Sequence, residues 1–126
     1  MSESIIFLRV IQIISEREDV KTFLFENVDG SPLLYKAGQF LTFITQVHGH
    51  EIRRSYSMSS APEVDPYPAI TVKRISNGEI SRTWTDHTQV GDVVQCLPPS
   101  GRFTVDEAHG VSRDIVLIGA GSGITP

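Results

Sequence analysis

The sequence contains a single cysteine, Cys96, which excludes an internal disulfide and any cluster held by several cysteines of this chain. It lacks an apolar stretch near the ~18 residues of a membrane-spanning helix, and no apolar run follows a basic start as in a signal peptide. It also lacks an excess of positive charge. The net charge of -4 argues against a general nucleic-acid binder. These absences predict a soluble, cytoplasmic domain.

What remains is an ordinary globular composition. The 126 residues fit one domain, with 40% hydrophobic and 21% charged residues. Most of the chain is typical of short β-strands, with alternating or β-branched residues bounded by turns. The expected strands span residues 4–15, 20–28, 38–47, 48–58, 69–75 and 91–97. Six short strands at close spacing favour a closed antiparallel barrel over an open sheet.

Three segments are expected to depart from this β pattern. The charged cluster 16–19 is interpreted as a solvated turn. Residues 77–87 predict one short helix with Trp84 in the core, because Ile80 and Trp84 fall at helical spacing. The polar start of that helix leaves backbone N–H groups free. The tail, 113–126, is an apolar strand that runs into a glycine loop, as at the start of a nucleotide-binding α/β domain.

The tail sets the expected domain organisation. Residues 1–109 are interpreted as a β-barrel domain, and residues 110–126 as the truncated start of a second domain. The polar, glycine-containing segment 106–113 is the expected linker. An α/β unit needs a helix and further strands after its glycine loop, so the chain is interpreted as the front part of a longer protein.

The stretch "RSYS" (54–57) carries the most specific chemistry. Arg54 and Tyr56 lie two apart and share one face of a strand. A guanidinium fork matches a phosphate, and a tyrosine ring offers a flat stacking surface. Ser57 lies on the next pleat, where its hydroxyl or backbone N–H can donate to a ring nitrogen. Taken alone, the triplet also fits a surface arginine beside a packed tyrosine.

Two further features favour a ligand with a phosphate group. The helix start at 78–81 offers backbone N–H groups and a hydroxyl. Lys73 and Arg74 add positive potential beside it. The glycine loop at 119–123 is a weak signal by itself, because it does not meet the G-x-G-x-x-G spacing. The order of these features along the chain is more informative than any one of them.

In this order, the motifs resemble the flavin domain of the ferredoxin–NADP reductase superfamily. The matching motifs are "YKAGQFL" (35–41), "RSYS" (54–57), "GEIS" (78–81), "PPSGRFTV" (98–105) and "LIGAGSGITP" (117–126). The wording "VKR" (72–74), "G-x-x-S-x-x-W" (78–84) and "PPSGRF" (98–103) is most similar to reductase components of bacterial multicomponent oxygenases, such as the phenylacetyl-CoA epoxidase reductase type. The resemblance implies a mainly β fold: a six-stranded antiparallel Greek-key barrel with one short capping helix. The first strand of a truncated α/β nucleotide-binding domain would follow.

The resemblance also implies a role for each matched residue. Arg54 would hold the diphosphate of FAD, and Tyr56 would stack on the isoalloxazine ring. Ser57, the one residue assigned to catalysis, would sit near the N5 atom of that ring. Further cofactor-binding residues would be Thr71, Val72 and Lys73 along the ribityl and phosphate region, Gly78, Glu79, Ile80 and Ser81 at the diphosphate, and Ser122 and Thr125 where the nicotinamide meets the flavin.

The implied function is that of an NAD(P)H-dependent flavin oxidoreductase. NAD(P)H would give hydride to FAD, and electrons would pass singly to an iron–sulfur domain or protein, or to another acceptor. No metal site is expected, because His48 and His50 have no clear third ligand. Two alternatives stay open. One is an FMN reductase of the phthalate dioxygenase type, since no aromatic residue between Arg74 and Gly78 covers an adenine. The other is a cofactor-free β-barrel interaction module.

Overall fold

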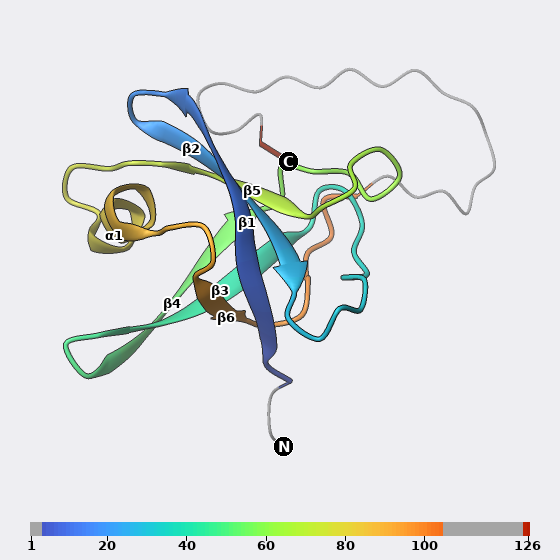
Figure 1. Ribbon diagram of the computed structural model, residues 1–126, viewed down its shortest axis with the longest axis horizontal. Coiled ribbons are helices and arrows are strands. Elements are labelled where there is room, and N and C mark those ends of the chain that lie inside the picture. Colours follow the sequence, from blue (N-terminus) through green and yellow to red (C-terminus); the bar gives the residue numbers. More distant parts are fainter. Residues whose placement is uncertain (1–3, 105–124) are drawn as a thin grey trace.

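The computed structural model describes residues 4–104 and 125–126 (Figure 1). This part of the chain forms six strands and one helix, and the helix lies between the fifth and sixth strands. Their bounds are β1 Ile6–Arg17, β2 Val20–Asn27, β3 Phe40–Val47, β4 His50–Ser57, β5 Ala69–Lys73, α1 Glu79–His87 and β6 Val93–Cys96. Among the residues described, no helix is long and apolar enough to cross a membrane.

The strands form one antiparallel sheet in the order β4-β3-β6-β1-β2-β5. Neighbours in this order are often distant in the sequence, as in Greek-key arrangements. The two end strands, β4 and β5, are joined just beyond β4 by an isolated bridge between Met58 and Ile70. This bridge closes the sheet into a barrel. The predicted fold, six antiparallel strands with one helix, is therefore confirmed.

The core fills the inside of the barrel, and α1 covers one of its sides. Buried residues alternate along the strands, because successive side chains point to opposite faces of a sheet. The ring of Trp84 from α1 lies 4.9 Å from that of Phe43 and 5.1 Å from that of Phe23, centroid to centroid. The predicted core position of Trp84 is thus confirmed, and Cys96 on β6 is also fully buried. The other fully buried hydrophobic side chains are Leu8, Val10, Phe25, Leu41, Met58, Ile70 and Val72.

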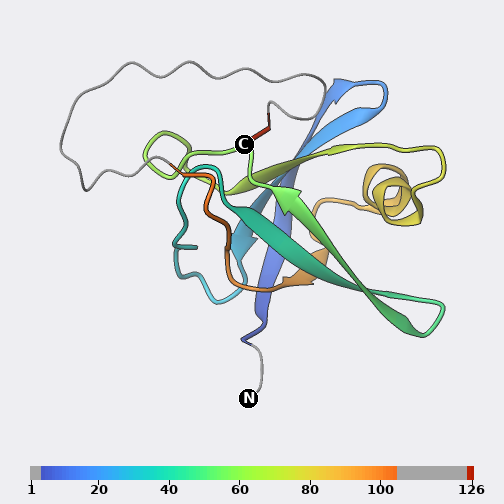
Figure 2. The ribbon, with the colours of Figure 1, turned by 180° about the vertical axis from the view of Figure 1, so that it is seen from behind.

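The hairpin of β3 and β4 turns at His48 and Gly49. Both residues have positive φ, 50° and 79°, which is the geometry of a type I′ turn and matches the twist of the two strands. Figures 1 and 2 both show the hairpin reaching beyond the rest of the sheet, on the side where α1 lies. The hairpin therefore carries β4 toward the helix.

The ends of the elements differ from the sequence expectations by a few residues. Glu16 and Arg17 continue β1, so only Glu18 and Asp19 form the turn that was expected across all four. The ladder extends because Arg17 pairs with Val20 across this tight turn, where a charged side chain still reaches water. The expected linker 106–113, the domain boundary at residue 109 and Ser122 lie outside the described residues.

Candidate functional site

β4 presents its two arginines to opposite faces of the sheet. Arg54 pairs across the ladder with Phe43, whereas Arg53 pairs with Ile44. Because Phe43 is buried in the core, Arg54 lies on the inward-facing side of the hairpin together with Tyr56. The Arg54 side chain is exposed and uses one N–H, at 2.9 Å, on the carbonyl oxygen of Arg53. Most of its five donors remain for a ligand.

Tyr56 is half-buried against the aromatic core. Its ring lies 6.3 Å from that of Phe43, and 6.2 Å from that of Trp84 in an edge-to-face arrangement. Burial raises the pKa of the Tyr56 phenol, and the neighbouring Arg54 partly offsets this increase. The ring is therefore neutral near pH 7 and is supported from behind by Trp84. Sequence reasoning placed Trp84 in the core but missed its contact with Tyr56, because pattern alone carries no information on that long-range contact.

The barrel is open between β4 and β5 on the hairpin side of the Met58–Ile70 bridge. Within the described residues, β4 is paired along its length only with β3, so its other backbone edge is available. The hairpin tip then meets the helix start, where His48 Nε2 lies 3.5 Å from Glu79 Oε1. Arg54 thus lies on the stretch of β4 between the bridge and the hairpin tip.

A small hydroxyl-bearing surface adjoins this opening on the outside of the barrel. Ser57 is half-buried and points to the opposite face from Tyr56, because the two are neighbours on a strand. Ser59 lies two residues after Ser57, and the Ser59 backbone N–H donates to the carbonyl oxygen of Ala69 at 2.8 Å. The Thr71 hydroxyl lies 2.9 Å from Ser59 Oγ, to which it can donate a hydrogen bond. We call Ser57, Ser59 and Thr71 the seam hydroxyls.

The start of α1 offers backbone groups and few side-chain groups. Gly78 is the N-cap and makes no side-chain capping bond, so the first N–H groups of the helix lack a side-chain acceptor from the cap. A Cβ at Gly78 would lie 2.7 Å from Ser81 Oγ and 3.1 Å from Ile75 Cβ, so this close approach requires glycine. The Ser81 hydroxyl is engaged locally, since it accepts from Ile75 N at 3.0 Å and donates to Gly78 O at 3.1 Å.

The other residues predicted at the helix start differ in what they offer. Ile80 is 5% exposed and packs in the core, so only its backbone can face a ligand. Glu79 is exposed and places a carboxylate at the first helical position. That carboxylate meets the positive end of the helix dipole, which is also where a phosphate would bind.

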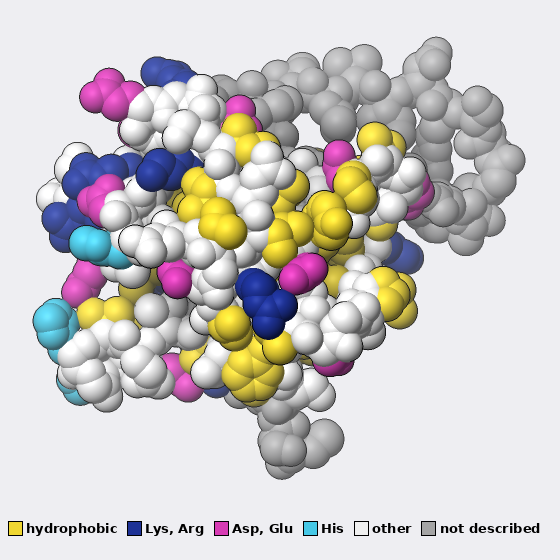
Figure 3. All heavy atoms as spheres, in the orientation of Figure 1, with side chains coloured by type: hydrophobic (Ala, Val, Ile, Leu, Met, Phe, Trp, Pro, Cys, Tyr) yellow, Lys and Arg dark blue, Asp and Glu magenta, His cyan; other side chains and the backbone are white. Residues whose placement is uncertain are grey.

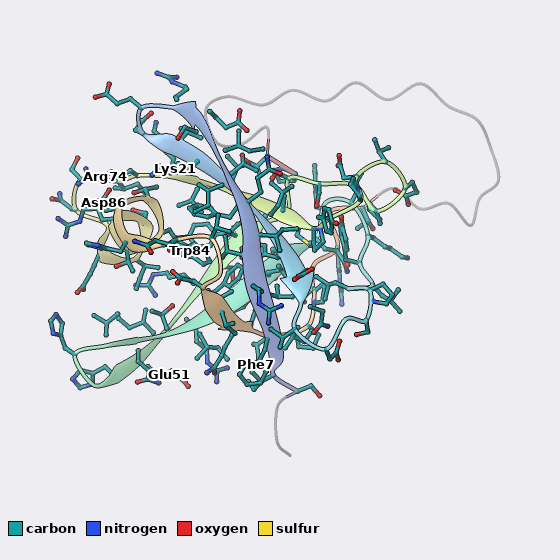
Figure 4. All side chains as sticks on the ribbon, viewed as in Figure 1. Phe7, Lys21, Glu51, Arg74, Trp84 and Asp86 are labelled. Carbon is teal, nitrogen blue, oxygen red and sulfur yellow. The ribbon has the colours of Figure 1, made fainter. Side chains whose placement is uncertain are left out.

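Positive charge gathers on the α1 side of the molecule, as Figure 3 shows. Lys73 ends β5 and is exposed. Arg74 is held by Asp86, with Nε 3.1 Å from Oδ1 and Nη2 3.2 Å from Oδ2 (Figure 4). The hydrogen bonds from Arg74 lower the pKa of Asp86. Because Arg74 already has a carboxylate partner, Arg54 and Lys73 are the better cations for a ligand.

Two further residue groups named from the sequence are the hairpin histidines and Thr125. His48 faces Glu79, and no cluster of three metal-ligating side chains occurs in the part of the chain that the structure describes. Thr125 is described as half-buried. A separate cleft of about 440 Å³ lies between the loops around Tyr35 and Tyr67. Its lining includes neither Arg54, Tyr56 nor Gly78, so it is distinct from the surface described above.

Comparison with known proteins places this geometry in a family. Residues 7–105 match the family described as "Oxidoreductase FAD-binding domain". The chain is 38% identical over 119 residues to a flavohemoprotein of Pseudomonas aeruginosa, which covers 94% of the chain. It is 38% identical over 124 residues to the ferredoxin reductase component of 3-ketosteroid-9-alpha-monooxygenase from Rhodococcus rhodochrous, which covers 96% of the chain.

A solved structure shows the same likeness in three dimensions. The crystal structure of the Amycolatopsis cytochrome P450 reductase GcoB superposes with a TM-score of 0.82 at 26% identity, over 97% of the chain. The chain spans only 36% of that protein, and 29% and 34% of the flavohemoprotein and the monooxygenase component. The likeness therefore concerns one part of these longer proteins.

Proposed function

The chain belongs to the oxidoreductase FAD-binding domain family, and from this premise we propose how its residues hold FAD. The diphosphate lies between the Arg54 guanidinium and the N-terminus of α1. The isoalloxazine ring lies against Tyr56 at the opening between β4 and β5, with Ser57 near its N5 atom. Thr71, Val72 and Lys73 follow the ribityl and phosphate region along β5.

The observation that carries this proposal is the uncapped start of α1. Its N-cap, Gly78, supplies no side-chain acceptor, and a Cβ there would collide with Ser81 Oγ at 2.7 Å. A phosphate supplies the acceptor oxygens that such a helix end lacks. In this arrangement Ile80 and Ser81 contribute backbone N–H groups, because their side chains are buried or engaged. Gly78 allows the close approach, since its own N–H donates to Ile75 O at 2.8 Å. Glu79 must turn its carboxylate away from the phosphate.

We further propose that the whole protein is an NAD(P)H-dependent flavin oxidoreductase. When bound, the flavin supplies the conversion between a two-electron hydride donor and a one-electron acceptor. The chain's own part is to position the ring with Tyr56 and to anchor the diphosphate with Arg54. Residues 110–126 would begin the nicotinamide-binding domain, with Ser122 and Thr125 near the site of hydride transfer. The acceptor would be an iron–sulfur domain or protein.

The finer assignment is to a reductase component of a bacterial multicomponent oxygenase, working in the cytoplasm where NAD(P)H is supplied. The monooxygenase reductase component among the relatives supports the oxygenase part. The phenylacetyl-CoA epoxidase type within that class rests on the resemblance of the motifs "VKR" (72–74) and "PPSGRF" (98–103).

Titration of the cofactor-free protein with FAD tests the proposal. We expect one FAD per chain, a yellow protein, and quenching or shifting of the flavin spectrum on binding. Release of the bound flavin and measurement of its mass distinguish FAD from FMN. A protein that stays colourless after reconstitution with either flavin would contradict the proposal.

A further inference from the structure

Four side-chain oxygens form an unbroken row across the outside of the barrel. Glu16 Oε1 on β1 accepts from the Thr22 hydroxyl on β2 at 2.9 Å. Thr22 Oγ1 lies 2.8 Å from Thr71 Oγ1 on β5, and Thr71 Oγ1 lies 2.9 Å from Ser59 Oγ. Thr22 is only 9% exposed, so the middle of the row is shielded from water. The row runs from a carboxylate at the end of β1 to two of the seam hydroxyls.

The hydrogens in this row are fewer than the contacts that Thr22 and Thr71 make. Each hydroxyl has one hydrogen to donate, and an ionised carboxylate can only accept. The hydrogen of Thr22 goes to Glu16, so Thr22 turns lone pairs toward Thr71. The single hydrogen of Thr71 then has two acceptors within reach, Thr22 and Ser59. The charge on Glu16 polarises the row and favours Thr22 as the acceptor.

We propose that Glu16 and Thr22 are positioning residues for the flavin, because they decide where Thr71 directs its hydroxyl hydrogen. When the row is intact, Thr71 donates this hydrogen to Thr22, and the seam hydroxyls present oxygen lone pairs to the flavin ring. When the row is broken, Thr71 can donate the hydrogen toward Ser59 and the cofactor instead. This inference rests on the proposed function, which places Thr71 and Ser57 along the flavin.

The sign of the effect follows from charge. A flavin that has received a hydride carries one more negative charge than the oxidised ring. Lone pairs on the seam, with the Glu16 carboxylate behind them, disfavour that added charge, whereas a hydroxyl hydrogen favours it. The intact row therefore lowers the reduction potential of the bound flavin. Replacement of Thr22 or Glu16 by a residue that breaks the row raises the potential.

The test is the midpoint potential of FAD bound to Thr22→Val, in which valine keeps the shape and removes the hydroxyl. We expect the ratio of affinities for reduced over oxidised FAD to rise about tenfold, which is ~30 mV for a two-electron couple. Affinity for oxidised FAD should change much less. Thr22→Ser, which keeps a hydroxyl, should restore the wild-type potential, which a packing role for the threonine methyl would not do.

Thr42→Val is the matched control. Thr42 makes a hydroxyl pair with Ser55 at 2.8 Å on the outside of the β3–β4 hairpin, without a bond to the row. The midpoint potential of FAD bound to Thr42→Val should equal that of FAD bound to the wild type. Should Thr22→Val fail to fold, Glu16→Gln at the exposed end of the row removes the charge and should raise the potential too.

The outcomes separate this inference from the function on which it rests. If the wild-type protein binds no FAD, both are overturned. If FAD binds normally and neither Thr22→Val nor Glu16→Gln moves the potential, the row has no such role while the flavin site stands. An equal shift in Thr42→Val would also overturn the role of the row, because it would mean that any lost hydroxyl on this surface has the same effect.

Discussion

At the level of single residues, the two neighbouring arginines of β4 should contribute unequally to FAD binding. Arg54 lies on the Tyr56 side of the strand, whereas Arg53 lies on the opposite side, with its Nε 3.1 Å from Glu51 Oε2. Arg54→Ala should weaken FAD binding by about 1.5–3 kcal/mol, the range for hydrogen bonds to charged groups. Arg53→Ala should cost far less. Titration of each cofactor-free variant measures the two losses, and equal losses would contradict the proposed position of the diphosphate.

Ser57 should affect hydride transfer more than flavin content. It is half-buried on the seam side of β4, where the proposed site brings it near the flavin N5 atom. Ser57→Ala should therefore slow reduction of the flavin by NAD(P)H in stopped-flow measurements, with the bound flavin per protein nearly unchanged. Ser55→Ala is the control, because Ser55 shares that face of β4 and pairs with Thr42. Reduction of Ser57→Ala at the wild-type rate would remove this residue from the mechanism.

At the level of elements, α1 packs on the barrel core through Ile80 and Trp84, and Trp84 is the larger of the two side chains. Trp84 is 5% exposed and contacts the rings of Phe23, Phe43 and Tyr56. Trp84→Ala should lower the free energy of unfolding by about 3–5 kcal/mol, the usual cost of removing a large buried aromatic. Arg82→Ala, on the exposed side of the same helix, should stay within about 0.5 kcal/mol. Urea denaturation of the cofactor-free proteins compares them, and similar losses would mean that α1 does not depend on Trp84.

The elements themselves were largely predictable from the sequence. Each of the six strands and the helix follows from local periodicity, and the shared face of Arg54 and Tyr56 follows from the two-residue period of a strand. The end of β1 was not predictable, because exposed charges such as Glu16 are equally acceptable in a turn and at the end of a hairpin. The aligned register of Arg17 and Val20 decides between them only in the folded chain.

The parts of the site that the sequence did not predict depend on long-range contacts. Trp84 lies behind Tyr56, and these two are far apart in the sequence. Glu16 is linked through Thr22 to Thr71, which is also distant from both in the sequence. Local periodicity says which face a residue occupies but not which strand lies next to it. The cofactor was predictable for a different reason, since the order of several motifs along the chain carried the resemblance to a flavin-binding family.

At the level of the whole molecule, the barrel should lose stability at alkaline pH because of Cys96. This side chain is 0% exposed, and burial raises the pKa of its thiol from 9.0 to about 12. Below pH 9 the thiol is protonated in both the folded and the unfolded chain, so ionisation takes nothing from the stability there. As the pH rises from 9 toward 12, the unfolded chain loses this proton and the folded chain keeps it, so the free energy of unfolding falls. At pH 10 the loss should be about 1.4 kcal/mol in the free energy of unfolding.

Comparison of wild type with Cys96→Ala isolates that loss from other alkaline effects. Burial also raises the pKa values of Tyr35 and Tyr56 from 10.0, and their effect is common to both proteins. Cys96→Ala should be less stable than wild type at pH 8, because it leaves a small cavity, but its free energy of unfolding should fall less between pH 8 and pH 10. Urea denaturation under reducing conditions at the two pH values measures both slopes. Parallel slopes would show that the thiol can ionise within the fold, and hence that water reaches the barrel interior at β6.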